Sequence, residues 1–229
     1  MRLFSYSFGF VYRLFLWGIW LKSVLDPCLM NIYSVIVGLM KPKDEKKLEA
    51  VIAATCRLAT KCGLYGLTLA QIAKEAGIAT STLYVYFPDK SALFNEVYRQ
   101  AKREALNSYS AGIDPKLPLK GRVRNVWNKM LDHRLQHFDQ VTFMEQFVGS
   151  SFMSDESRAY VEQHGEGLIR IVIEGQREEI LKPIPISFIG ALFFGSIRET
   201  ARLVRAGSIA DTEEAREIAF QLCWDGVRA

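Results

Sequence analysis

The chain has 229 residues, a mass of 26.0 kDa and a formal net charge of +4. This length is enough for one or two domains that bury a hydrophobic core without the help of disulfides or metals. The four cysteines include no CxxC pair and are too few for a disulfide scaffold, which argues against a structural zinc site or a redox motif. We therefore expect reduced thiols and a cytoplasmic location. The mildly basic charge permits an acidic partner without requiring one.

The first 40 residues differ in composition from the rest of the chain. They hold only four charged residues, yet nine of the 27 aromatic residues. Leu3–Leu21 has the length of a membrane-spanning helix, but Arg13 would be costly at the bilayer centre, and no signal cleavage site follows. The charged, globular composition begins at Met40. We therefore favour a misassigned start for residues 1–40, with membrane association as the alternative.

Local signals for helices begin after this segment. Between 48 and 62, apolar residues recur every three or four positions, which predicts an amphipathic helix that Gly63 ends. Thr68 and Gln71 have the spacing of a capping box, which predicts a second helix over 69–76.

A turn at Gly77 leads to a third, very short helix, which we expect from Thr80 or Ser81 to Phe87. Asp89 is a suitable N-cap for a fourth helix. Two short helices joined by a turn that contains glycine form a helix-turn-helix pattern. The outward positions of the third helix carry hydroxyls and phenols with scarcely a charge, which suits a helix that lies in the major groove of DNA.

Three motifs follow one another in this segment: Ile-Ala-x-x-Ala-Gly-Ile at 72–78, Thr-Leu-Tyr-x-Tyr-Phe at 82–87 and Lys-x-x-Leu at 90–93. Together they resemble the DNA-binding domain of the TetR/AcrR family of transcriptional regulators. This ordered set is more restrictive than a generic helix-turn-helix pattern. Residues 1–40 depart from the family, which opens with a short charged arm, and the departure supports the misassigned start.

The resemblance implies DNA contacts for eight residues. Those expected to face base edges are Ala79, Thr80 and Ser81. Those expected to hold phosphates are Thr68, Thr82, Tyr84, Tyr86 and Lys90. The lysines that resemble the family's basic arm are Lys41, Lys43, Lys46 and Lys47.

No arginine stands among the base-facing residues, so hydroxyl contacts, methyl contacts and DNA shape are expected to share the specificity. Residues 41–104 carry eleven Lys or Arg and seven Asp or Glu, so they hold a net charge of +4 and the other residues balance to zero. This local charge agrees with DNA binding.

Further helices are expected after a linker at 111–115. Their ranges are 118–136, 140–150, 155–181, 186–205 and a last helix from an Asp211 cap to Val227. The chain lacks the alternation that is typical of strands, so we predict an all-α fold. The resemblance implies a three-helix helix-turn-helix DNA-binding domain over 41–104. It also implies a C-terminal helical domain for effector binding and dimerisation over 105–229.

The expected helix over 186–205 is apolar nearly all round, so it must be buried on more than one side. Burial within one protomer is possible, but we favour a two-fold dimer interface of four helices, which would give two DNA-binding heads for a palindromic site. The residues expected in this interface are Phe188, Ala191, Leu192, Gly195 and Leu222.

Large apolar side chains on the two helices before residue 150 are candidates for an effector pocket. The residues are Trp127, Met130, Phe143 and Phe147. An aromatic and methionine set at helical spacing is more often ordinary core, and the resemblance implies a ligand cavity without identifying its lining.

The sequence shows no signature of a cofactor or of an enzyme. His133 and His137 have a spacing that can bind a metal, but no HExxH motif supports it, so we predict no metal site. Phosphate-binding loops and nucleophile elbows are missing as well. We predict a homodimeric, ligand-responsive regulator, a repressor of a palindromic operator in double-stranded DNA, released by a small-molecule effector. The alternative is a membrane-anchored helical interaction protein that uses residues 1–40.

Overall fold

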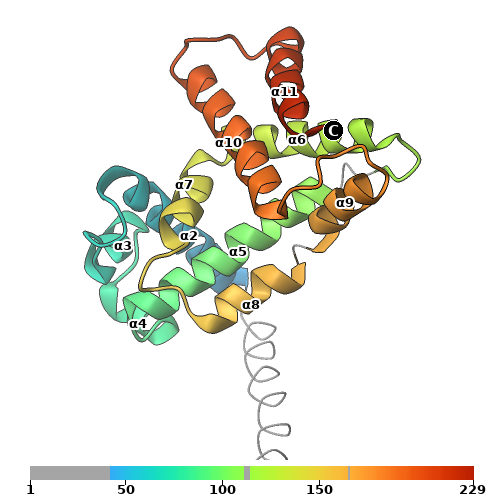
Figure 1. The fold of residues 1–229 in the computed structure, drawn as a ribbon. Helices are drawn as coiled ribbons and strands as arrows, with labels where there is room; N and C mark the ends of the chain where they lie inside the picture. Colours follow the sequence, from blue (N-terminus) through green and yellow to red (C-terminus); the bar gives the residue numbers. More distant parts are fainter. Residues whose placement is uncertain (1–41, 111–113, 165) are drawn as a thin grey trace, which may run out of the picture. The chain divides into compact units, whose positions relative to one another are not determined.

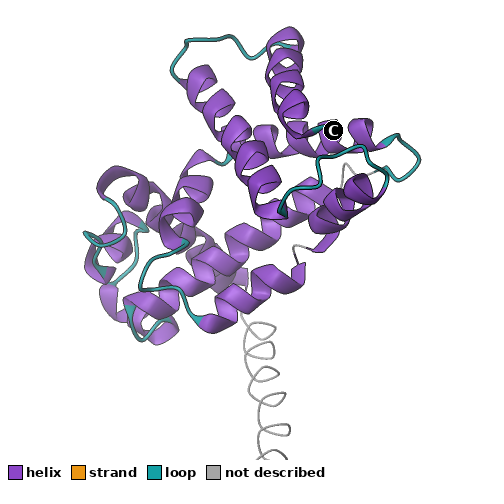
Figure 2. Cartoon of the chain, viewed as in Figure 1, coloured by secondary structure: helices purple, strands orange, loops and turns teal. Residues whose placement is uncertain are grey.

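The computed structural model describes residues 42–110, 114–164 and 166–229. The expectations for residues 1–40 and for Lys41 lie outside these ranges. Within them, every regular element is a helix, and one isolated antiparallel bridge joins Leu181 to Arg228 (Figures 1 and 2). The predicted all-α class is confirmed. None of the helices in the described ranges is long and apolar enough to cross a bilayer.

The hydrophobic core of the described residues lies in one compact unit, Ala50–Ala229. The helices up to residue 110 are α2 (Pro42–Cys62), α3 (Leu69–Glu75), α4 (Thr80–Tyr86) and α5 (Lys90–Ser110). Helix α5 runs without a break past residue 104, so the domain boundary expected at 104/105 falls inside one helix.

The ends of these helices follow the local signals in the sequence. Gly63 and Gly77 follow α2 and α3 with positive φ angles of 73° and 70°. Glycine adopts this left-handed conformation without the clash that a Cβ atom would cause. The side chain of Asp89 accepts the N–H of Ala92 at 2.8 Å, as predicted for the N-cap of α5.

The remaining helices are α6 (Leu119–Gln136), α7 (Phe138–Phe147), α8 (Asp155–His164), α9 (Glu166–Arg177), α10 (Ile186–Arg205) and α11 (Glu213–Val227). Two expectations are corrected here. The single helix expected over 155–181 is two helices, α8 and α9. The N-cap of α11 is Thr212, whose hydroxyl accepts the N–H of Ala215, because the carboxylate of Asp211 is bound to Arg216 instead.

Helix α6 is the centre of the packing, since it contacts α5, α7, α9, α10 and α11. Trp127 of α6 is fully buried, and its indole N–H donates to the hydroxyl of Ser196 on α10 at 3.0 Å. Its ring meets Phe220 of α11 edge-on, with ring centroids 6.1 Å apart. One tryptophan thus joins three helices.

The side chains expected to line an effector pocket are part of this core. Phe143 and Phe147 of α7 are fully buried and stack on each other, with centroids 5.7 Å apart. Phe94 of α5 meets Phe143 edge-on at 5.7 Å, and Met130 is also buried. The effector pocket predicted at Trp127, Met130, Phe143 and Phe147 stays a prediction. In this structure the four side chains are buried and packed between helices, as in a protein interior.

Candidate nucleic-acid interface

Thr68 fixes the start of α3 through a capping box. Its hydroxyl accepts the N–H of Gln71 at 3.2 Å, and the side-chain oxygen of Gln71 accepts the N–H of Thr68 at 2.9 Å. The pair satisfies two amides that would otherwise lack a partner. Ile72 and Ala73 are fully buried on the inner side of α3, while Thr68 stays exposed at its start.

Helix α4, which packs against α3, presents a narrow outward face. Ser81, Tyr84 and Val85 are exposed; Tyr84 and Val85 follow Ser81 by three and four positions, so both lie on the same side of the helix as Ser81. Leu83 is fully buried and holds the opposite side. The local spacing that predicted this surface thus agrees with the exposure of its central residues.

The sequence reasoning missed Val85, which is 82% exposed compared with 55% for Tyr84. Val85 is the unspecified position of the Thr-Leu-Tyr-x-Tyr-Phe motif, so the resemblance assigns it no role, although apolar groups contact the methyl group of thymine. Ala79 is the exposed N-cap of α4. The other predicted contacts on α4 are half-buried: Thr80, Thr82 and Tyr86.

Lys90 differs from the other predicted phosphate contacts because its ammonium group is bound within the protein. It donates to three carbonyls of the turn between α2 and α3, those of Leu64, Tyr65 and Leu67, at distances between 3.1 and 3.4 Å. The same ammonium lies over the rings of Phe94 and Phe152. The structure therefore gives Lys90 a different set of partners from the predicted phosphate.

The loop between α7 and α8, residues 148–154, packs against this turn and against α5. The side-chain amide of Asn95 donates to the carbonyl of Phe152 at 2.7 Å, and its oxygen accepts the N–H of Ser154 at 3.0 Å. The rings of Tyr65 and Phe152 lie 5.3 Å apart. Hydrogen bonds to the hydroxyl and the amide of Ser151 lower the pKa of Tyr65.

An apolar cavity of about 120 Å³ lies among α6, α9 and α10. Its lining is apolar throughout and includes Val126, Ile171, Ile189, Phe193 and Phe194. The four residues predicted for the effector pocket are not part of it. Two of its lining residues, Ile169 and Phe194, are exposed, so the pocket opens to solvent. Its apolar walls suit a small apolar molecule.

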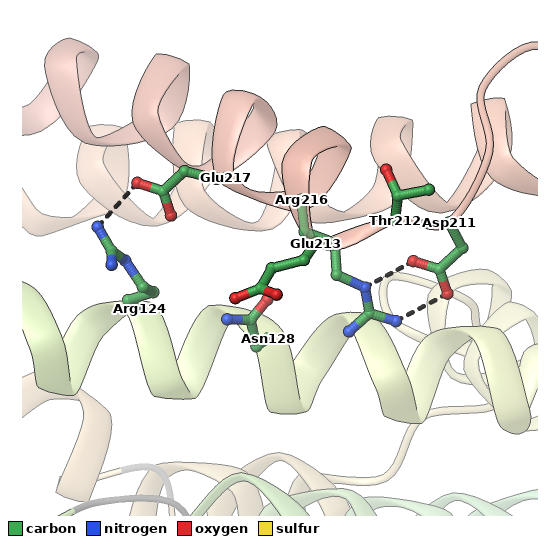
Figure 3. Close-up of a pocket in the computed structure, with 7 residues that line it drawn as sticks. All are labelled: Arg124, Asn128, Asp211, Thr212, Glu213, Arg216 and Glu217. Atoms are coloured by element: carbon green, nitrogen blue, oxygen red, sulfur yellow. Dashed lines mark hydrogen bonds and ion pairs between the residues drawn. The ribbon is translucent and has the colours of Figure 1, made fainter.

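A second cavity, of about 430 Å³, is polar and lies between α6 and the start of α11 (Figure 3). Two ion pairs line it: Arg216 binds Asp211 at 2.6 Å, and Arg124 of α6 binds Glu217 of α11 at 2.8 Å. Arg216 also binds Asp132 of α6 at 2.6 Å. The pairs Arg124–Glu217 and Arg216–Asp132 tie α11 to α6. Both arginines of this cavity are therefore already paired within the protein.

Helices α10 and α11 pack side by side (Figure 1). Both expose apolar side chains. Phe188 is 66% exposed and Leu222 is 72% exposed, while Leu192 and Ala191 are also exposed and Gly195 is half-buried. We refer to these five residues as the α10–α11 face. Exposed large apolar side chains of this kind are typical of a protein interface.

His133 and His137 lie against each other, with ring centroids 4.6 Å apart. In the part of the chain that the structure describes, no three His, Cys, Asp or Glu side chains are placed to hold a metal ion. His133 is buried, and its Nε2 atom has no hydrogen-bond partner. Burial and the neighbouring His137 together lower the pKa of His133 to about 4.

This lowered pKa predicts that stability decreases as the pH falls from about 6.5 to about 4. In that window the unfolded chain protonates His133 and the folded protein does not, so the free energy of unfolding declines with falling pH. Urea denaturation over a pH series measures the decline. We expect a smaller decline for His133→Phe, and equal declines for both proteins would contradict the assignment.

The helical organisation agrees with comparisons to known proteins. Residues 51–97 match the family described as bacterial regulatory proteins, tetR family. Residues 100–229, more than half of the chain, match the Tetracyclin repressor-like C-terminal domain. The chain belongs to the TetR family. It is a DNA-binding transcriptional regulator by membership of that family, with a helix-turn-helix region followed by a helical C-terminal region.

Several curated regulators are similar to this TetR-family chain. BetI of Stenotrophomonas maltophilia, an HTH-type transcriptional regulator, is 35% identical over 88 residues, 36% of this chain and 45% of BetI. The HTH-type regulator YhgD of Bacillus subtilis is 28% identical over 94 residues, 41% of this chain and 48% of YhgD. The matches thus span less than half the length of both proteins. The Fatty acid metabolism regulator protein of Bacillus subtilis is 24% identical over 171 residues, 70% of this chain and 84% of that protein.

Solved structures give the same result at the level of the fold. A TetR family transcription regulator from Marinobacter aquaeolei VT8 superposes with a TM-score of 0.77 at 26% identity, over 82% of this chain and 99% of that one. A putative tetR family regulator from Shewanella sp. PV-4 superposes with a TM-score of 0.70 at 22% identity, over 80% and 98%.

Proposed function

We propose that this TetR-family regulator is a cytoplasmic, homodimeric repressor that binds a palindromic operator through α3 and α4 and is released by a small apolar effector. The observation that carries the proposal is the outward face of α4. Ser81, Tyr84 and Val85 are exposed there on a helix that the buried Leu83 anchors. A short helix with hydroxyl, phenol and methyl groups fits contacts with phosphates and base edges in the major groove.

To bind the two half-sites of a palindromic operator, two helix-turn-helix regions must be held at a fixed distance. The α10–α11 face supports the proposed dimer, because its exposed apolar side chains would be removed from water by a second copy of the same face. The small side chains of Ala191 and Gly195 would let a partner helix approach closely.

The apolar cavity among α6, α9 and α10 is the proposed effector site, in place of the residues expected from the sequence. Its wholly apolar lining offers no partner to a charged or hydrogen-bonding group, so the part of the effector that enters is a hydrocarbon group. The name of one relative, the Fatty acid metabolism regulator protein, supports an effector with an apolar chain.

Ser81→Glu is expected to weaken DNA binding by at least about tenfold, because a carboxylate on the outward face of α4 would meet the phosphates of the duplex. Fluorescence anisotropy with a labelled operator, selected from a random duplex pool by the wild-type protein, measures the change. Ser81 is exposed, so the fold is expected to remain intact. The control is Ser208→Glu, which adds the same charge at an exposed position after α10. Equal affinities of the two variants would refute α4 as the DNA-contacting helix.

A further inference from the structure

The surroundings of Lys90 are unusual for a lysine that binds DNA. It stands in the first turn of α5, where the positive end of the helix dipole opposes a cation. Its ammonium group instead finds the carbonyls of Leu64, Tyr65 and Leu67. The last of these residues directly precedes Thr68, so Lys90 holds the turn from which α3 begins.

Part of this lysine site comes from the 148–154 loop. The ring centroid of Phe152 lies 4.8 Å from the ammonium nitrogen, closer than that of Phe94 at 5.7 Å. Asn95 fixes Phe152 through the hydrogen bond to its carbonyl, and the Tyr65 ring packs against Phe152 from the turn. The turn before α3 and the loop after α7 therefore both contact the ammonium group of Lys90.

We propose that Lys90 is a positioning residue, which fixes the turn between α2 and α3 instead of binding a phosphate, and that the 148–154 loop controls DNA affinity through it. The proposal rests on the proposed DNA binding by α3 and α4. A displaced Phe152 removes an aromatic ring from the cation and loosens the turn, while Ser81, Tyr84 and Val85 stay chemically unchanged. The loop joins α7 to α8. A change in the packing of the C-terminal helices would therefore move Phe152, and through Lys90 it would change the turn from which α3 begins.

The salt dependence of DNA affinity distinguishes a positioning lysine from a phosphate-binding one. A side chain that neutralises a phosphate contributes about 0.9 to the magnitude of the slope of log affinity against log salt. Removal of such a contact lowers the affinity and flattens the slope by about that amount. Removal of a positioning residue lowers the affinity and leaves the slope unchanged, because the same phosphates are still bound.

The experiment uses the full chain and a fluorescein-labelled random-sequence duplex, with anisotropy titrations over a series of NaCl concentrations. Lys90→Met keeps the long apolar stem and removes the charge, and Phe152→Leu removes the ring on the loop. We expect both variants to lose about tenfold in affinity with the wild-type slope, since hydrogen bonds to a charged donor stabilise the turn. The control is Lys116→Met, which removes a charge from an exposed position before α6 and should leave both quantities unchanged.

A slope flattened by about 0.9 in Lys90→Met would show a phosphate contact and overturn the proposal. Wild-type affinity in Phe152→Leu would overturn the part played by the loop. Circular dichroism checks the folding of Lys90→Met; if this variant does not fold, Phe152→Leu decides alone by the same criteria. A wild-type protein that does not bind the duplex would remove the proposed function itself, and this proposal with it.

Discussion

Leu222→Asp is expected to weaken dimerisation by at least about a hundredfold. Leu222 is 72% exposed in the protomer, so the carboxylate is hydrated there and the protomer keeps its fold. In the proposed dimer, each copy would bury this charge without a partner against the apolar side chains of the α10–α11 face, which costs several kcal/mol. Sedimentation equilibrium over a range of protein concentrations gives the dissociation constant of the dimer.

The control for this prediction is Val85→Asp, which places the same side chain at another exposed apolar position, on α4. It should leave the dimer intact and weaken binding to DNA, whereas Leu222→Asp should remove the dimer first. A Leu222→Asp protein that dimerises like the wild type would show that the α10–α11 face is not the interface.

Trp127→Ala is expected to lower the free energy of unfolding by about 3–5 kcal/mol. The indole is fully buried among α6, α10 and α11, so its removal leaves a cavity. It also removes the N–H group that donates a hydrogen bond to the hydroxyl of Ser196. Urea denaturation at one fixed protein concentration measures the change, because the proposed dimerisation would make the stability depend on concentration.

The matched control is Val85→Ala, a truncation at an 82% exposed position, which should change the free energy of unfolding by less than about 0.5 kcal/mol. A loss below about 1 kcal/mol in Trp127→Ala would mean that the neighbourhood of Trp127 is loosely packed. That result would favour the hypothesis from the sequence that an effector pocket lies at this position.

The helix-turn-helix region could be predicted almost residue by residue because its signals are local. A capping box at Thr68, glycines at 63 and 77 and an N-cap at Asp89 act within a few positions along the chain, and the structure uses each of them. The bounds of α10 were predictable for a similar reason, since Pro185 precedes it and Gly207 follows it. The buried Leu83 and the exposed Ser81 and Tyr84 of α4 agree with the sequence pattern, whereas the exposed Val85 stands at a position that the motif leaves unspecified.

Contacts between distant segments decided what the sequence left open. Trp127 is part of the core because α10 and α11 cover it, and Phe143 because α5 covers it. The spacing of residues within α6 or α7 does not predict which helices these neighbours are. Likewise, the partners of Lys90 come from the turn before α3 and from the 148–154 loop, some 25 and 60 positions away.

The sequence by itself determined the all-α class, the family and the order and ends of the DNA-binding helices, because these depend on hydrogen bonds and side-chain spacing within single turns. Only the tertiary structure decided which large side chains enclose a cavity, which fill the core and which cation is held by the protein itself. Those outcomes depend on how helices that are far apart in the chain pack, and the same amphipathic pattern is compatible with several such packings.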